Sequence, residues 1–257
     1  MSSILVKLVG KSLNGLSCFS KTLAANAALQ LFSIPRKGQI SEIQARFLAT
    51  AKNQILEYNS QQIMTYYWQG ARKTILLAHG WESNAGRWKQ LIKHLKKHNY
   101  TIVALDAPAH GNSGSNRFNA LLYSEFIHVV SQKFQPNIII GHSVGGMASV
   151  FFQNKYQIKY LEKLVLLGSP CDFKDILKRY TDMLGYNHKI SKRLNSIIKA
   201  RFGDSPDNFS TAKYIENINC KGLIIHDEDD AIIPFNDAIK IKSNFKDSIL
   251  ISTKGLG

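Results

Sequence analysis

A short segment in the middle of the chain places a serine between two glycines, in a spacing that suits nucleophilic chemistry. Residues 138–147 read IIIGHSVGGM, an apolar run that passes through Gly-His-Ser-Val-Gly into small residues. A serine at the tip of such a strand–turn–helix has its hydroxyl exposed above the sheet. Gly141 and Gly145 relieve the crowding of a tight turn, where a Cβ would collide with neighbouring backbone. We therefore predict that Ser143 is a nucleophile; the alternative is a serine that only starts a helix.

The segments around this serine alternate between strand and helix patterns. Trp88, Leu91, Ile92 and Leu95 have the spacing of a helix stripe, and Asn119 is placed to cap the next helix. This alternation predicts an α/β fold, a doubly wound and mostly parallel sheet with helices on both faces. Ligands of such sheets bind beyond the carboxyl ends of the strands. Buried strands are predicted at 74–78, 100–105, 163–167 and 221–226 and at the apolar run that begins at Ile138, with an edge strand at 62–69 and a last strand at 248–252.

Three regions are expected along the chain. Residues 1–60 form an N-terminal helical extension, and residues 61–257 form one α/β domain. Within that domain, residues 171–215 interrupt the alternation with two helices, the first capped by Asp172 and closed by Gly185. Helices inserted at this point would cover the carboxyl ends of the strands as a lid.

The N-terminal extension is predicted to contain one amphipathic helix that packs on the domain or on another subunit. The alternative is a helix that makes weak contact with a membrane surface through Lys7, Lys11 and Lys21. No apolar stretch is long enough for a transmembrane helix or a signal peptide. The apolar residues that recur at near-helical spacing are Leu5, Val9, Leu16, Phe19, Leu23 and Ala27.

The composition narrows the classes of function. The 257 residues include 33 basic and 18 acidic residues, a net charge of +15, but the lysines are dispersed and no nucleic-acid module is present. We therefore predict no nucleic-acid partner and interpret the charge as a lysine-rich surface. Cys18, Cys171 and Cys220 have neither disulfide nor metal-ligand spacing, which fits a reducing, cytoplasmic location. Neither a metal nor a cofactor is implied, and the oligomeric state stays open.

Four motifs in a fixed order resemble the α/β-hydrolase superfamily, and in particular its bacterial serine hydrolases. They are His79-Gly-Trp, Asp106-x-Pro-x-His-Gly-x-Ser, Gly141-His-Ser-Val-Gly and Asp230-x-x-Ile-Pro. The resemblance covers residues 62–257. It implies the α/β-hydrolase fold with the helical lid.

The resemblance also assigns roles to individual residues. Ser143 is implied as the nucleophile and Asp230 as the acid of the triad, although Asp227, Glu228 and Asp229 crowd the same turn and Asp172 is a distant second choice. The backbone N–H groups of Trp81 and Val144 match the donors of the oxyanion hole. The site-lining residues implied are His79, Gly80 and His142.

The base of this triad is the unusual point. The order Ser, Asp, His of this fold places the base after Asp230, but no histidine follows His226. The chain ends in Thr253-Lys-Gly-Leu-Gly, which resembles the stretch that directly precedes the catalytic histidine in the bacterial subset. We expect a fragment that stops just before this histidine, because the last strand also lacks a following helix. His110 and His188 are disfavoured substitutes.

The predicted reaction is hydrolysis of a small-molecule carboxylic ester or thioester through an acyl-Ser143 intermediate. A second reading within enzymes is C–C bond hydrolysis or acyl transfer on the same scaffold. From a different class comes a catalytically impaired binding protein that kept the fold without the base histidine.

Overall fold

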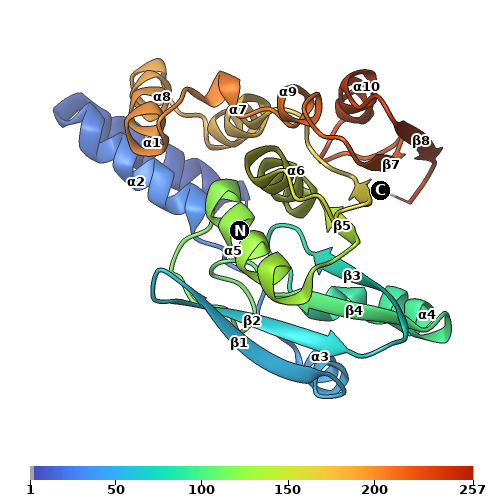
Figure 1. Ribbon diagram of the computed structural model, residues 1–257. Helices are drawn as coiled ribbons and strands as arrows, with labels where there is room; N and C mark the ends of the chain where they lie inside the picture. Colours follow the sequence, from blue (N-terminus) through green and yellow to red (C-terminus); the bar gives the residue numbers. More distant parts are fainter. Residues whose placement is uncertain (1–2, 257) are drawn as a thin grey trace.

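The computed structural model describes residues 3–256, which form a single eight-stranded sheet with helices on both faces (Figure 1). The strand order is β1-β2-β4-β3-β5-β6-β7-β8. The pairs β1–β2 and β2–β4 are antiparallel, and all other neighbours are parallel. The strands are β1 (Lys52–Tyr58), β2 (Gln61–Trp68), β3 (Arg72–Ala78), β4 (Tyr100–Leu105), β5 (Ile138–His142), β6 (Lys163–Leu167), β7 (Lys221–Asp227) and β8 (Ser248–Thr253).

The helices form three groups, and each group has its own apolar core. Two groups cover the faces of the sheet, and the third packs mainly helix on helix. On one face, α5, α6, α9 and α10 pack on the sheet around Phe126 and Phe152. On the other face, α3 and α4 pack around Trp88 and Ile92. The third group consists of α1, α2, α7 and α8, and its core includes Met147 and Phe151 of α6. The helices are α1 (Ser3–Phe19), α2 (Lys21–Ser33), α3 (Glu42–Leu48), α4 (Lys89–Lys97), α5 (Ala120–Phe134), α6 (Val144–Tyr156), α7 (Phe173–Leu184), α8 (His188–Phe202), α9 (Thr211–Ile215) and α10 (Phe235–Asn244).

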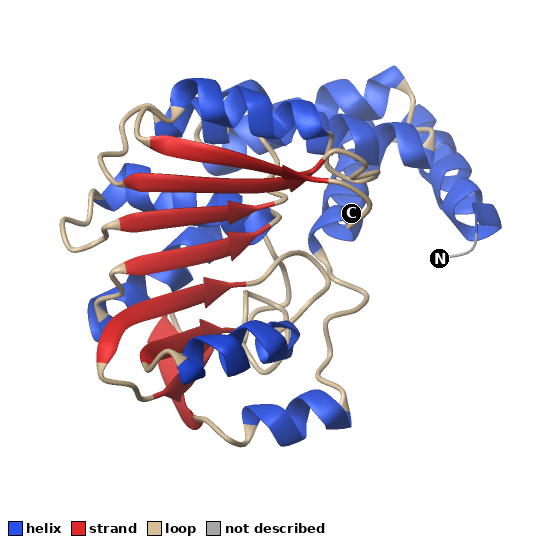
Figure 2. Cartoon of the chain, turned by 90° about the vertical axis from the view of Figure 1, so that its right-hand side faces the viewer, coloured by secondary structure: helices blue, strands red, loops and turns tan. Residues whose placement is uncertain are grey.

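The predicted α/β class and mostly parallel sheet are confirmed. The parallel strands point toward one edge, where the long loops and the N-terminal helices gather (Figure 2). Asn119 caps α5 as predicted, since its Oδ1 accepts a hydrogen bond of 2.8 Å from the Leu122 N–H. Val144 begins α6 directly after the serine.

The edge of the sheet was predicted wrongly. The strand at Gln61–Trp68 lies between β1 and β4, and Lys52–Tyr58 forms the actual edge strand. Residues 52–58 alternate exposed and half-buried side chains, and most of them are polar. The burial pattern of an outermost strand is too weak to distinguish it from a helix or a loop by apolar spacing alone.

The N-terminal segment also differs from its prediction, because it forms two helices rather than one. Ser20 separates α1 from α2 and caps the second helix, with its Oγ accepting a hydrogen bond from the Leu23 N–H. The expectation that the segment packs on the domain is confirmed for α2, which buries Ala24, Ala25 and Ala28 against α8 and its neighbours. Within residues 3–256, no helix is long and apolar enough to cross a membrane.

Asp172 occupies the expected position before α7, but its side chain makes no capping hydrogen bond. Its carboxylate instead lies 3.4 Å from the Lys240 Nζ, on a helix far away in the sequence. The ends of both helices follow the prediction, since Gly185 and Gly203 adopt positive φ angles after α7 and α8.

Candidate active site

Ser143 stands between the end of β5 and the first turn of α6, at a strained point of the backbone. Its φ and ψ are 51° and −128°, a region that residues with a Cβ rarely adopt and that costs about 1–3 kcal/mol. The Ser143 N–H is held by the Leu167 carbonyl at 2.9 Å, and its own carbonyl accepts the Gly146 N–H at 2.9 Å. The junction is therefore fixed by both neighbouring elements.

The close packing of this junction depends on glycines. A Cβ on Gly145 would lie 2.4 Å from the carbonyl oxygens of Ala78 and His79, and one on Gly141 would lie 2.5 Å from the Gly146 Cα. The loop after β3 passes just as close, because a Cβ on Gly80 would lie 2.9 Å from the Ser143 Cβ. The absence of side chains at these positions brings the β3 loop directly against the serine.

This proximity places two backbone donors beside the serine. Trp81 follows Gly80 in the β3 loop, and Val144 is the first residue of α6. Within residues 3–256, neither N–H is engaged by a hydrogen bond from another loop or strand. Unengaged backbone N–H groups near a reacting carbonyl are the kind of donor that stabilises a developing oxyanion.

Two buried histidines shape the loop that carries Trp81. His79 is fully buried; its Nδ1 donates to the Gly80 carbonyl at 2.8 Å, and its Nε2 accepts from the Ala107 N–H at 2.9 Å. Burial lowers the pKa of His79 to about 3, so the ring is neutral at physiological pH. His110 accepts the Glu82 N–H through Nε2, and its Nδ1 lies 2.8 Å from the Pro108 carbonyl. Both nitrogens of each ring contact backbone groups, and these contacts fix the loop after β3.

His142, directly before the serine, faces Arg87. Its Nδ1 accepts a hydrogen bond from the Arg87 Nη1 at 2.7 Å. Burial, together with the nearby Arg87 charge, lowers the pKa of His142 to about 4. Arg87 belongs to no recognisable motif of the sequence, because its partner lies 55 positions away in the chain.

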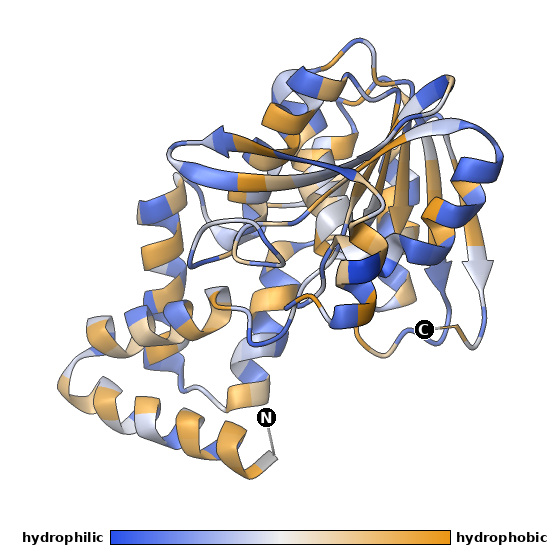
Figure 3. Cartoon of the chain, turned by 90° about the horizontal axis from the view of Figure 1, so that it is seen from below, coloured by the Kyte–Doolittle hydropathy of each residue, from blue (hydrophilic) through white to orange (hydrophobic). Residues whose placement is uncertain are grey.

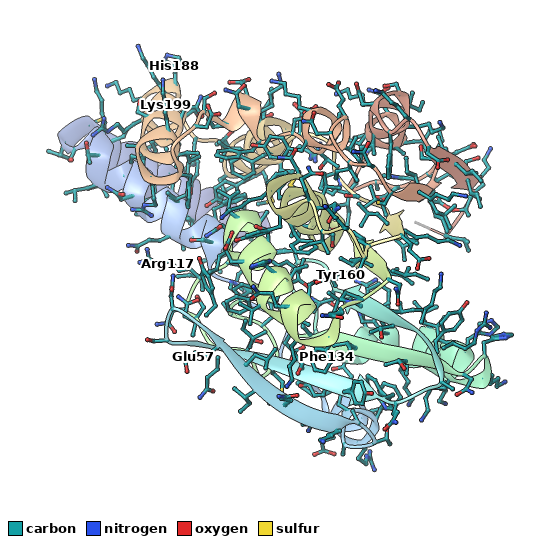
Figure 4. The ribbon with its side chains drawn as sticks, viewed as in Figure 1. Glu57, Arg117, Phe134, Tyr160, His188 and Lys199 are labelled. Atoms are coloured by element: carbon teal, nitrogen blue, oxygen red, sulfur yellow. The ribbon has the colours of Figure 1, made fainter. Side chains whose placement is uncertain are left out.

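The remaining histidines lie away from the serine. His188 is exposed at the start of α8 and points outward from the body, as does Lys199 on the same helix (Figure 4). His128 stacks on Tyr156 at a ring distance of 3.5 Å. His226 is buried, with its Nε2 2.8 Å from the Ile233 carbonyl and 3.7 Å from the Asp230 Oδ2. The hydrogen bonds of residues 3–256 include none between a histidine and the Ser143 hydroxyl.

Two carboxylates of the acidic turn after β7 have different hydrogen-bond partners. The Asp227 Oδ2 accepts hydrogen bonds from the Thr253 hydroxyl and the Leu256 N–H, each at 2.8 Å, and so anchors the loop after β8. The Asp230 Oδ1 accepts the N–H groups of Ile232 and Ile233 at 2.8 and 2.9 Å.

The second oxygen of Asp230 points across the carboxyl ends of the strands. Its Oδ2 lies 3.6 Å from the place that a Cβ on Gly168 would occupy, and Gly168 follows the residue that holds the Ser143 N–H. The Asp230 charge also acts on His142, since it opposes the lowering of the His142 pKa. Of the carboxylates in this turn, Asp230 therefore faces Gly168 and His226, whose Nε2 lies 3.7 Å from its Oδ2, and Asp227 faces the last strand.

Asp106 is a site-supporting residue whose function the sequence analysis did not assign. It is fully buried; its Oδ1 accepts the Ala85 N–H at 2.8 Å, and its Oδ2 accepts the Asn112 N–H and the Tyr66 hydroxyl, each at 2.9 Å. Burial raises the pKa of this carboxyl. One side chain thereby ties the β3 loop to the β4 loop and to β2. The motif around Asp106 was visible in the sequence, but these contacts depend on the folded chain.

A cavity of about 510 Å³ opens beside Ser143. Its wall is mostly apolar and combines residues from the sheet edge, from α2 and from the helices between β6 and β7. The contribution of α2, which includes Leu29 and Phe32, was not expected. Three arginines and no acidic residue contribute to the lining, namely Arg36, Arg117 and Arg201. A volume of this size suits one small-molecule ligand.

Within the described residues, no group of three or more His, Cys, Asp or Glu side chains is arranged to hold a metal ion.

The sheet order, the strand-to-helix serine and the loops above the strands define an α/β hydrolase. Comparison with known families agrees: residues 69–203 match the family described as "Serine aminopeptidase, S33". The chain belongs to this family.

Two individual relatives match this chain over shorter stretches than the family does. The chain is 28% identical to a monoacylglycerol lipase of Mycolicibacterium smegmatis over 113 residues, which covers 40% of each protein. It is 31% identical over 111 residues to a pimeloyl-[acyl-carrier protein] methyl ester esterase of Pectobacterium carotovorum, with 42% of each covered. The matches thus span about two fifths of the length of these curated relatives.

A putative lipase from Acinetobacter baumannii superimposes with a TM-score of 0.63 at 18% identity, over 82% of this chain and 87% of the other. This likeness shows the shared fold.

Proposed function

We propose that the protein is a serine hydrolase that cleaves a carboxylic ester or thioester of an apolar acyl group. The observation that carries the proposal is the position of Ser143, which is part of the cavity lining together with Val144 and Trp81. A substrate acyl chain in the apolar cavity would bring its carbonyl carbon to the serine hydroxyl. The names of the two curated relatives, a lipase and a methyl ester esterase, point in the same direction.

The proposed reaction has two steps. In the first, the Ser143 Oγ bonds to the carbonyl carbon, the oxyanion is held by the N–H groups of Trp81 and Val144, and the alcohol or thiol leaves with the serine proton. In the second, water attacks the acyl-serine, and the acid and free serine are released. Asp230 orients the base that carries the proton between these groups.

The base itself is assigned by family resemblance. In the family pattern it is a histidine on the loop after the last strand, and no histidine follows His226 in the 257 residues. The anchor of this loop is described: the Asp227 carboxylate holds Thr253 and Leu256 at the same turn that carries Asp230. The acid and the loop are therefore side by side, as a base on that loop would require.

The test uses the protein with its natural C-terminus and a series of p-nitrophenyl esters of increasing acyl length. We expect hydrolysis that falls at least about a thousandfold in the Ser143→Ala variant. A fluorophosphonate probe should add its mass to the peptide that contains Ser143. Cys18→Ser, a change at an exposed residue of α1, is the matched control and should leave the rate unchanged.

Two outcomes would contradict the proposal. Ester hydrolysis that survives in Ser143→Ala would remove the serine from its assigned role. If the protein with its natural C-terminus binds the p-nitrophenyl esters but does not hydrolyse them, the binding-protein alternative is favoured.

A further inference from the structure

Helix α1 meets the body through Gly10, Asn14 and Ser17, and Leu13 and Leu16 pack beside them against the core shared with α2 and α8. Gly10 lies so close to α7 that a Cβ on it would be 1.7 Å from the Leu184 carbonyl oxygen. The Asn14 side chain donates to the Gly185 carbonyl at 2.8 Å and accepts the Asn187 N–H at 2.9 Å. The Ser17 hydroxyl, also buried, accepts from the Asn187 side chain at 2.9 Å. Glycine and polar groups thus make the closest contacts to the body.

The opposite side of α1 presents large apolar side chains to solvent. Leu8 and Phe19 are eleven residues apart, which places them on one line of a helix with 3.6 residues per turn. Leu8 is 55% exposed and Phe19 is 92% exposed, while Ile4 and Leu5 extend the same apolar face at the start of the helix. A surface helix of a globular protein normally buries this side. The apolar face of α1 is therefore available to a partner.

The exposed apolar residues are concentrated in the N-terminal helices. Of the fifteen large apolar side chains that are exposed within the described residues, seven lie between residues 4 and 34. The N-terminal helices project from the body, and apolar residues run along their length (Figure 3). The seven side chains, here called the N-terminal apolar surface, are Ile4, Leu5, Leu8, Phe19, Leu23, Leu31 and Ile34.

This surface shares one residue with the lining of the cavity. Leu31 belongs to the surface and also lines the cavity. Met183 is exposed at the cavity rim, and it is the neighbour of Leu184, the residue that Gly10 of α1 contacts. Ile232 is a third exposed apolar residue in the cavity lining. An apolar partner that covers the N-terminal apolar surface would therefore also contact the mouth of the cavity beside Ser143.

The charges around this surface are mostly positive. The first acidic residue of the chain is Glu42, and the 41 residues before it contain five basic residues: Lys7, Lys11, Lys21, Arg36 and Lys37. The segment from Cys171 to Gly203, which packs against α1 and α2, has eight basic and three acidic residues, a net charge of +5. A second copy of the chain would bring like charges together across this surface. An anionic and apolar partner complements it instead.

We propose that the N-terminal apolar surface docks on a phospholipid bilayer that carries anionic headgroups. The apolar side chains of α1 and α2 would enter the boundary between headgroups and acyl chains, and the flanking lysines would contact phosphate groups. Docking of this kind presents the mouth of the cavity to the bilayer. If the proposed function holds, the ester substrate then reaches Ser143 from the membrane.

The test measures flotation of the purified protein with vesicles, in the Ser143→Ala variant so that turnover plays no part. We expect binding to vesicles of phosphatidylglycerol mixed with phosphatidylcholine, little binding to phosphatidylcholine alone, and weaker binding in high salt. The double change Leu8→Ser with Phe19→Ser should lower the partition coefficient about tenfold or more. Lys7→Gln with Lys11→Gln should lower it and flatten its salt dependence.

Matched controls distinguish docking through this surface from nonspecific adsorption to vesicles. Ile43→Ser with Ile239→Ser removes two exposed apolar side chains from α3 and α10, and Lys96→Gln with Lys97→Gln removes two exposed charges from α4. Both control pairs should bind vesicles like the parent protein. Unchanged thermal unfolding of all four pairs confirms that they fold.

The proposal is overturned if the parent protein binds neither kind of vesicle, or if the Leu8/Phe19 pair binds as well as its control. A dimer that dissociates on the Leu8/Phe19 change, without vesicle binding, would assign the surface to a second copy and also overturn it. None of these outcomes depends on ester hydrolysis, so a failure here is distinct from a failure of the proposed function.

Discussion

Single carboxylates in the turn after β7 have different surroundings although they are close in sequence. Asp230 has one oxygen held by two backbone N–H groups, and its other oxygen lies near Gly168 and 3.7 Å from the His226 Nε2. Asp227 uses its Oδ2 to hold the loop after β8. The two residues should therefore respond in opposite ways to the same substitution.

We expect Asp230→Asn to lower kcat by about 10⁴-fold, the scale seen when a triad carboxylate becomes an amide, with little change in stability. Asp227→Asn should instead lower the free energy of unfolding by about 1–3 kcal/mol, because two donors lose a charged acceptor. Ester kinetics and urea unfolding of both variants measure the contrast. Equal losses of activity in the two variants would mean that Asp230 has no special role.

His142 gives a residue-scale prediction for pH. Its pKa is lowered to about 4 in the folded protein, by burial and by Arg87, from an ordinary value of 6.5. The unfolded chain therefore binds more protons than the folded one between these pH values, and stability is lost as the pH falls from about 6.5 toward 4. A single group of this kind contributes a slope of at most about 1.4 kcal/mol per pH unit.

The variant His142→Gln keeps an acceptor for Arg87 but does not titrate. Its free energy of unfolding should fall less steeply than that of the parent protein between pH 6.5 and 4. Both proteins keep the neutral His79, so its contribution cancels in the comparison. The difference at pH 8 measures the changed hydrogen bond alone. Parallel curves across the acid range would refute the assigned cause.

At the scale of elements, the sequence was informative where a pattern is local. The buried strands β3 to β7 are continuous apolar runs, and the Asn119 cap and the glycines after α7 and α8 act within a few residues. These features were predicted correctly because neighbouring residues determine them.

Elements whose character depends on distant contacts could not be predicted in this way. The edge strand β1 has few buried side chains, so apolar spacing carries little signal for it. The break between α1 and α2 at Ser20 interrupts a spacing that otherwise continues, and of the residues that define this spacing α1 exposes Leu5 and Phe19 but packs Leu16 on the body. Asp106 and Arg87 act through partners that are tens of residues away. Such contacts are a property of the folded chain.

The contact between α1 and α7 leads to a prediction with a close control. Gly10 and Gly15 both lie within α1, but a Cβ on Gly10 would clash with the Leu184 carbonyl, while one on Gly15 would meet nothing within 4 Å. We expect Gly10→Ala to release α1 from the body and to speed hydrogen exchange in this helix. Gly15→Ala should slow exchange there, since alanine favours the helix by about 1 kcal/mol over glycine. Similar exchange in both variants would show that the tight contact does not hold α1.

On the scale of the whole molecule, the N-terminal helices, the helices between β6 and β7 and part of α6 share one core. Ala28 of α2 and Leu194 of α8 are fully buried in it, together with Met147, which also lines the cavity. The remaining two cores lie between the sheet and its covering helices and use other residues. Damage to the shared core should therefore loosen the wall of the cavity and leave the sheet intact.

Ala28→Leu tests this separation, because an added side chain in a filled core costs about 1–3 kcal/mol. We expect faster hydrogen exchange in α2, α7 and α8, unchanged exchange in β3 to β6, and a raised KM for long acyl esters with less effect on short ones. Gln30→Leu adds a comparable apolar side chain at an exposed position of the same helix and should change none of these. A uniform loss of protection across the sheet would show instead that the three cores unfold as one unit. The helices that form the cavity wall could then not open independently of the sheet.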